Sequence, residues 1–118
     1  MKRFGGAVIA LLAFGAAAYA ADDPYAVYYK NTLVITSAKN VVTKIFANKD
    51  GTWTSTSSDG TSGHGQWAGL GNYTCVSDAA MPKQAPSCNA FVAHKVGDTW
   101  TEPGMGGTTD KLALVAGR

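Results

Sequence analysis

The chain has few of the residues that most often catalyse reactions or bind metals. Its 118 residues include two histidines, two cysteines and a single glutamate. It contains no Gly-x-Ser-x-Gly nucleophile elbow and no closely spaced ligand motif such as Cys-x-x-Cys. We therefore expect no catalytic residues, no metal and no cofactor. His64 and His94 are expected to be solvated surface residues.

Clustered positive charge is also lacking. The chain carries ten Lys and Arg against eight Asp and Glu, for a formal charge of +2. Loss of Lys2 and Arg3 with the leader described below would bring the charge to zero, and the other cations are scattered singly. Nucleic-acid binding needs several neighbouring cations to displace counterions from phosphates. We therefore expect no nucleic-acid partner and no binding to an anionic membrane surface.

One long apolar run lies at the N-terminus. Lys2 and Arg3 precede an uncharged segment, and Ala18-Tyr19-Ala20 places small residues where a signal peptidase requires them. We predict a signal peptide over 1–20 and a single mature domain over 21–118, located in the periplasm or secreted. The alternative is a retained membrane anchor, because the apolar run is close to the lower limit of about 17–25 residues for a span.

Two cysteines, Cys75 and Cys88, lie in the mature region. In an oxidising compartment a pair without competitors is expected to form one disulfide. The disulfide would close a loop that contains residues 76–87, and this closure would stabilise the fold by roughly 3 kcal/mol in the chain-entropy model. The alternative is a metal or redox pair, which usually has closer spacing and, for metals, more ligands.

The mature region is typical of short strands joined by tight turns. Alternating polar and apolar residues predict strands, while Asp50-Gly51 and Asp59-Gly60 indicate hairpin turns. No segment has ten residues of helical periodicity, and 24–30 fits either a short helical turn or a first strand. The predicted strands are 32–36, 41–48, 52–57, 64–68, 73–77, 88–94, 99–101 and 112–116.

This pattern predicts an all-β domain. We expect a small antiparallel up-and-down β-barrel, with a strongly curved meander sheet or a sandwich as alternatives. Consecutive hairpins favour up-and-down order, and closure would remove exposed strand edges. Gly63 and Gly65 are expected to mark a bulge or a sharp bend in their strand. The glycine-rich segment 103–109 is expected to be a loop rather than a phosphate-binding site.

Several short motifs follow one another in a recurring order. The first are 31–36, 42–44 and 48–54, which together form a strand–turn–strand. They are followed by Gly65-Gln66-Trp67, Tyr73-Thr74-Cys75 and 96–100. In this order they resemble small exported proteins of Gram-negative bacteria whose function is uncharacterised. The resemblance covers roughly residues 29–100 and implies a shared fold and compartment, without an activity. The chain is also similar in size, export and single disulfide to meander barrels of the lipocalin and avidin type, and to barrel inhibitors of bacterial metalloproteases.

Four aromatic residues on four predicted strands are the candidate ligand-binding residues. On one interior face they would form either a filled aromatic core or a ligand pocket. In a pocket, indole N–H and phenol O–H groups would orient a small apolar, amphipathic or sugar-like molecule. Ser55 and Ser57 share a strand face with the first tryptophan, and their small size favours a pocket or an exposed tryptophan over a tight core. The four residues are Trp53, Trp67, Tyr73 and Trp100.

The sequence therefore predicts an exported, non-catalytic domain that binds a small apolar or amphipathic ligand. One alternative is a protein-interaction module, such as an inhibitor of an exported hydrolase, that uses the acidic-aromatic segment 22–25. Another is a structural accessory protein of the cell envelope. A small enzyme would require His94 and Asp98 to lie together in a cleft. The oligomeric state is left open.

Overall fold

The computed structural model describes residues 23–118, so the predicted signal peptide over 1–20 lies outside the described residues. In the described part, no helix is long and apolar enough to cross a membrane. A short 3₁₀ turn, η1 (Ala26–Tyr28), precedes the strands, and a second, η2 (Met105–Gly107), follows the seventh. The strands are β1 (Thr32–Thr36), β2 (Val42–Ala47), β3 (Thr52–Ser57), β4 (Ser62–Leu70), β5 (Tyr73–Asp78), β6 (Ser87–Ala90), β7 (Thr99–Pro103) and β8 (Thr109–Val115).

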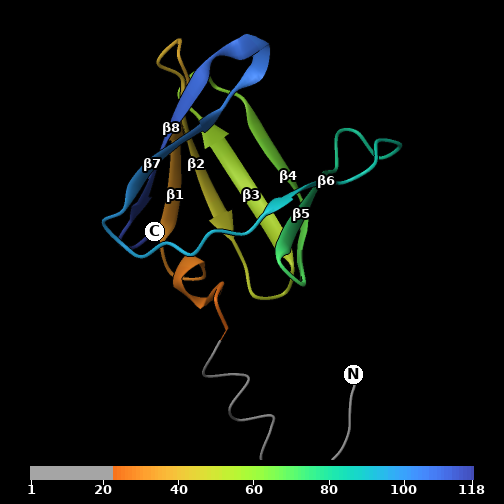
Figure 1. Cartoon of the computed structure of the whole chain (residues 1–118). Coiled ribbons are helices and arrows are strands. Elements are labelled where there is room, and N and C mark those ends of the chain that lie inside the picture. Colours follow the sequence, from red (N-terminus) through yellow and green to blue (C-terminus); the bar gives the residue numbers. More distant parts are fainter. Residues whose placement is uncertain (1–22) are drawn as a thin grey trace, which may run out of the picture.

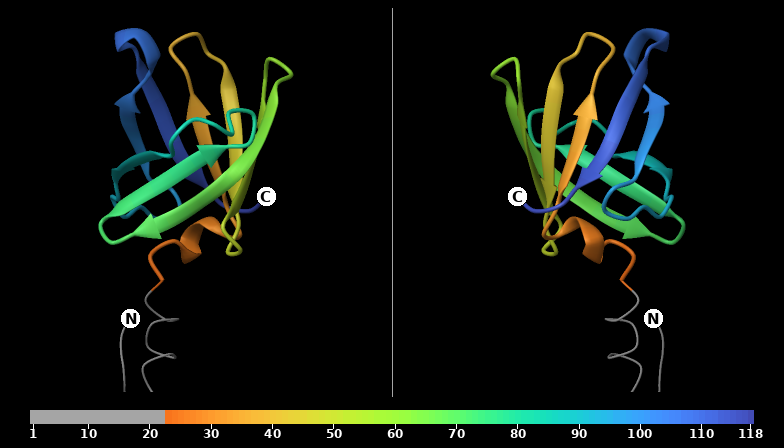
Figure 2. Two further views of the ribbon diagram at one scale, coloured as in Figure 1. Left: turned by 90° about the vertical axis from the view of Figure 1, so that its right-hand side faces the viewer. Right: turned by 90° about the vertical axis from the view of Figure 1, so that its left-hand side faces the viewer.

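The eight strands form one antiparallel sheet in the order β6-β5-β4-β3-β2-β1-β8-β7. Strands β1 to β6 form a continuous meander, and β8 returns to pair with β1 from Thr32↔Val115 to Thr36↔Lys111. This is the neighbour order of an up-and-down barrel that lacks only the pairing of β6 with β7. Figures 1 and 2 show the resulting curved half-barrel. The predicted all-β meander is confirmed, in its curved-sheet form rather than as a closed barrel.

Tight turns occur where the Asp-Gly pairs predicted them. Gly51 and Gly60 have φ angles of 88° and 91°, which glycine adopts without a steric penalty. Asp50 accepts hydrogen bonds from the hydroxyl and the N–H of Thr52, and Asp59 does the same with the threonine two residues further on. The hydroxyl bond, followed by the N–H bond, lowers the pKa of both carboxyls below the ordinary value. Local hydrogen bonding therefore fixes both turns without burial.

Two predicted strands have different extents in the structure. Strand β4 runs from Ser62 to Leu70 and pairs with β3 in uninterrupted register, so its glycines mark no bulge. The strand predicted over 88–94 ends at Ala90, and residues 91–98 continue as an irregular connection to β7. This connection crosses in front of the lower part of the sheet, from β6 on one side to β7 on the other (Figure 1).

The disulfide between Cys75 and Cys88 is present, as predicted. The two residues lie directly opposite one another in the pairing of β5 with β6, with Cα atoms 4.0 Å apart. All four residues of β6 are exposed, so the bond fastens an otherwise weakly packed edge strand to the sheet. A disulfide is compatible with an exported protein.

Buried apolar side chains are few among the described residues, and two of the three lie on β8. The register aligns Leu33 with Ile45 and Leu114 on the concave face. Leu114 and Leu112 are 1% and 6% exposed, and Cys75 is the third buried hydrophobic residue of the described chain. Side chains of the protein therefore do not fill the concave face.

The C-terminal residue ties the base of the half-barrel together. The guanidinium of Arg118 donates hydrogen bonds to the carbonyl oxygens of Tyr28 (2.9 Å) and Ala47 (2.6 Å) and to the side-chain oxygen of Asn48 (2.8 Å). It also lies 4.9 Å from the ring centre of Phe46, which permits a cation–π contact. The turn η1 is thereby held against β2 and the β2–β3 turn.

Candidate ligand-binding site

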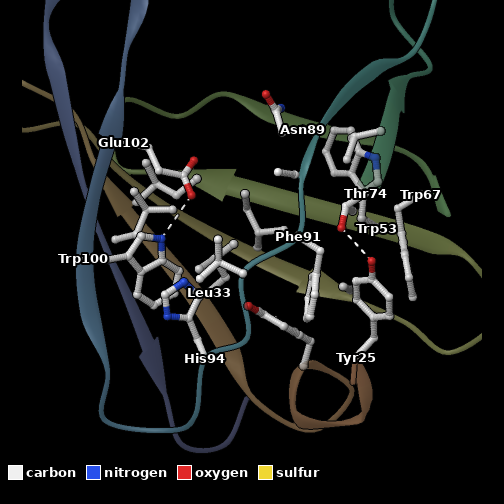
Figure 3. A pocket seen from close by; sticks show the side chains of 18 of the residues that line it. Tyr25, Leu33, Trp53, Trp67, Thr74, Asn89, Phe91, His94, Trp100 and Glu102 are labelled. Atoms are coloured by element: carbon white, nitrogen blue, oxygen red, sulfur yellow. Dashed lines mark hydrogen bonds between the residues drawn. The ribbon is translucent and has the colours of Figure 1, made fainter. Parts of the chain in front are cut away.

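The concave face of the sheet contains a cavity of about 590 Å³. This volume falls within the range of roughly 300–1,000 Å³ that is usual for small-molecule sites. Aromatic side chains form two walls, one on the side of β3–β5 and one on β7, with Phe91 between them (Figure 3). The floor is aliphatic and comes from β1, β2 and β8, with the side chains of Leu33, Ile35, Ile45 and Leu112.

Trp53 and Trp67 form the wall on the side of β3–β5. The indole N–H of Trp53 donates to the Ser77 carbonyl oxygen at 3.0 Å, and that of Trp67 donates to the Asn48 carbonyl oxygen at 3.0 Å. Both rings are therefore fixed by the protein backbone. Contrary to the prediction, these two N–H groups are paired within the protein instead of awaiting a ligand.

Glycines on β4 make room for Trp53. A Cβ atom on Gly65 would collide with the Ser77 carbonyl oxygen and lie 2.8 Å from Trp53 Nε1. A Cβ atom on Gly63 would lie 3.6 Å from the same indole ring. The indole of Trp53 thus crosses β4 to reach β5. The Gly-x-Gly spacing is therefore a sequence signal for a large side chain on a neighbouring strand.

Tyr25 extends the aromatic wall at the base of the cavity. Its ring centre lies 4.9 Å from that of Trp67 and 4.7 Å from that of Phe91. Its hydroxyl forms a 2.7 Å hydrogen bond with Thr74 Oγ1. The ring can approach β4 because a Cβ on Gly69 would lie only 2.6 Å from it. Sequence reasoning missed Tyr25 and Phe91, since neither lies on one of the strands that were expected to carry the site.

The opposite wall combines Trp100 with polar side chains. His94 stacks on Trp100 with ring centres 3.4 Å apart and an interplanar angle of 7°. The indole N–H of Trp100 donates to Glu102 Oε2 at 3.0 Å. The side chain of His94 is only 16% exposed, so the prediction of a solvated surface residue is wrong for His94. It holds for His64, which is exposed.

The pKa of Tyr28 reflects the burial and the charges near this wall. Burial raises its pKa above the ordinary value, and the Glu102 carboxylate, the Tyr25 phenol once it is ionised and the Asp98 carboxylate raise it further, in that order. The Tyr28 phenol is therefore held in its neutral form. The carboxylates of Glu102 and Asp98 place negative charge on this side of the cavity.

Tyr73 does not line the cavity with the three tryptophans. Its side chain is 54% exposed, while the next residue, Thr74, faces the cavity and bonds to Tyr25. Successive residues of a strand point to opposite faces, so Tyr73 lies on the convex face. The expectation that all four candidate aromatics gather on one face is thus met by Trp53, Trp67 and Trp100 only.

His94 and Asp98 lie close together, with Nδ1 3.6 Å from Oδ2. Asp98 Oδ2 also accepts a hydrogen bond from the backbone N–H of Lys95 at 3.0 Å, which fixes the turn before β7. This local role accounts for Asp98 without a reaction. Within residues 23–118, no group of three or more His, Cys, Asp or Glu side chains is placed to hold a metal ion.

No family model, curated protein or solved structure gives a significant match to this chain. The resemblance to exported Gram-negative proteins and to lipocalin-type barrels therefore stays a prediction. Function is inferred from the cavity itself.

Proposed function

We propose that this protein is an exported, non-catalytic binder that takes a small apolar or amphipathic molecule into the concave face of the half-barrel. The observation that carries the proposal is a cavity lined by apolar side chains that the described chain leaves uncovered. Val76 and Val92, which line it, are 39% and 63% exposed. Removing apolar surface from water is favourable by about 25 cal/mol per Å², so a ligand that covers these side chains gains affinity.

The volume favours a pocket over the alternative of a filled aromatic core. A filled core would leave space for one or two waters, whereas the cavity measures about 590 Å³. The rings at its walls are held apart by bonds to the protein, such as those from Trp53 to β5 and from Trp100 to Glu102. Such fixed rings reduce the ordering cost of binding.

The protein-interaction alternative has less support. It requires the segment 22–25 to reach a partner, but the Tyr25 side chain lies inside the cavity against Trp67. Asp23 accepts hydrogen bonds from the backbone N–H of Tyr25 and the hydroxyl of Tyr29. Both residues are thus engaged with their own chain.

Titration with the neutral apolar dye N-phenyl-1-naphthylamine tests the proposal. We expect saturable binding at one site, with increased dye emission and energy transfer from tryptophan. Val76→Glu places a charge in the cavity lining and should weaken binding at least tenfold, since an unpaired charge must then be desolvated.

Leu70→Glu is the matched control. Leu70 is 60% exposed on the neighbouring strand β4 and does not line the cavity, so this variant should bind the dye as the parent does. Equal loss in both variants, or dye binding that does not saturate, would contradict a specific site.

A further inference from the structure

The indole N–H groups of the cavity walls and one pair of hydroxyls are used within the protein, while Tyr28, Asn89, His94 and Thr101 add further donors to the lining. The indole N–H groups of Trp53 and Trp67 donate to backbone carbonyls, and that of Trp100 donates to Glu102. The hydroxyls of Tyr25 and Thr74 bond to one another. A ligand that offers only acceptors would find few partners among the indole N–H groups and this pair of hydroxyls.

Acceptor capacity remains at Glu102. An ionised carboxylate has about four lone-pair sites on its two oxygens. Oε2 accepts the Trp100 N–H, and the side chain belongs to an exposed residue that lines the cavity. A donor on a ligand can therefore approach this carboxylate from the cavity.

The carboxylate of Glu102 gives the cavity lining a negative charge, while the Arg118 guanidinium lies at the base, bonded to backbone carbonyls of Tyr28 and Ala47. Among the described residues that line the cavity, none is a lysine or arginine. Asp98 adds a second carboxylate beside His94. The faces of aromatic rings also carry negative potential, which attracts cations within about 6 Å of the ring centre. An anionic ligand, such as a fatty-acid carboxylate, would meet no cation in this lining.

These observations rest on the proposed function and sharpen it. We infer that the preferred ligand is an organic cation, a quaternary or alkyl ammonium group on an apolar body, whose charge lies next to the Glu102 carboxylate. The apolar body occupies the space between the tryptophan walls, over the aliphatic floor. Charge complementarity, rather than size, then selects the ligand.

Isothermal titration calorimetry with three matched compounds tests this inference. They are 4-phenylbutyltrimethylammonium, 4-phenylbutanol and 5-phenylpentanoate, which share a phenylalkyl body and differ in charge. At low salt, and at a pH at which histidine is neutral, we expect the cation to bind about tenfold more tightly than the carboxylate, with the alcohol between them. Added salt should weaken binding of the cation and leave that of the alcohol unchanged.

Glu102→Gln removes the charge and keeps an oxygen that can accept the Trp100 N–H. We expect the advantage of the cation over the alcohol to fall to about twofold or less, while affinity for the alcohol is unchanged. Asp59→Asn is the control for net charge, because Asp59 lies in the β3–β4 turn and does not line the cavity. This variant should keep the preference for the cation.

The outcomes separate the two proposals. If none of the three compounds binds and the neutral dye also fails, the proposed function is wrong. If the compounds bind with equal affinity, or the carboxylate binds best, the cavity is a binding site but the inferred charge of the ligand is wrong. Retention of the full cation preference in Glu102→Gln would also overturn the assigned role of Glu102.

Discussion

Strands β1 and β8 lie at opposite ends of the described chain and pair at five positions, whereas β6 and β7 are neighbours in the chain and do not pair. The first seam joins aliphatic side chains, such as Leu33 opposite Leu114. The second seam is flanked by aromatic rings, with Phe91 against Tyr25 on one side and His94 on Trp100 on the other. An eight-stranded barrel has an interior only just wide enough for side chains. The comparison indicates that the aliphatic seam supplies stability and the aromatic seam gives access to the cavity.

The largest expected effect is a loss of stability at the closed seam, where β1 pairs with β8. Leu114→Ala should lower the free energy of unfolding by about 4 kcal/mol, since a side chain that is 1% exposed leaves a cavity when truncated. Val92→Ala at the open seam removes a side chain that is 63% exposed and should cost less than about 0.5 kcal/mol. Urea unfolding of both variants measures the difference, and similar losses would contradict the division of roles.

An intermediate effect concerns the wall next to the open seam. Gly65→Ala should destabilise the protein by about 2 kcal/mol or more, because the new methyl group collides with the Ser77 carbonyl oxygen and with the Trp53 indole that donates to it. Gly63→Ala is the matched control, since its Cβ would meet only the Ser55 hydroxyl at 3.1 Å and the indole at 3.6 Å. Near-ultraviolet circular dichroism, combined with urea unfolding, follows the indole. The assigned role of Gly65 fails if both glycines tolerate alanine equally.

The smallest effect concerns Tyr29, the residue that directly follows η1. Burial, the hydrogen bond to Asp23 and the Asp23 charge raise the pKa of Tyr29 from 10.0 to about 12. Because the folded state favours the neutral phenol, this stabilisation is complete below pH 10 and is lost as the pH rises towards about 12. Tyrosinate absorbance should show a late-titrating group that Tyr29→Phe removes. A late step that persists in this variant would assign the shift to another tyrosine.

Local chemistry made much of the fold predictable. The turns at Gly51 and Gly60 depend on residues within one tetrapeptide, and the disulfide had only one possible pairing. The lack of a seam between β6 and β7 was not predictable, because the apolar run after Ala90 fits a strand as well as a connection. Whether these residues form a strand or a connection depends on aromatic rings that distant segments of the chain supply.

The candidate site was predictable only in part for the same reason. The three tryptophans lie on the face that was expected to carry the site, but Tyr73 lies on the other face. If a strand is placed one residue out of register, each of its side chains moves to the opposite face of the sheet. The sequence of β5 does not determine which of its residues face the cavity. Tyr25 enters the site from outside the sheet through its contacts with Trp67 and Thr74, which strand patterns do not contain.

Amide hydrogen exchange of the free protein tests most directly whether the half-barrel is closed at one seam and open at the other. We predict that amides of β1 and β8 that take part in their pairing exchange only by global unfolding, whereas those of residues 92–94 exchange orders of magnitude faster. Addition of the neutral dye should slow exchange in 92–94 alone. Equal protection at the two seams would mean that β6 and β7 pair, that the barrel is closed, and that the cavity has no entrance there.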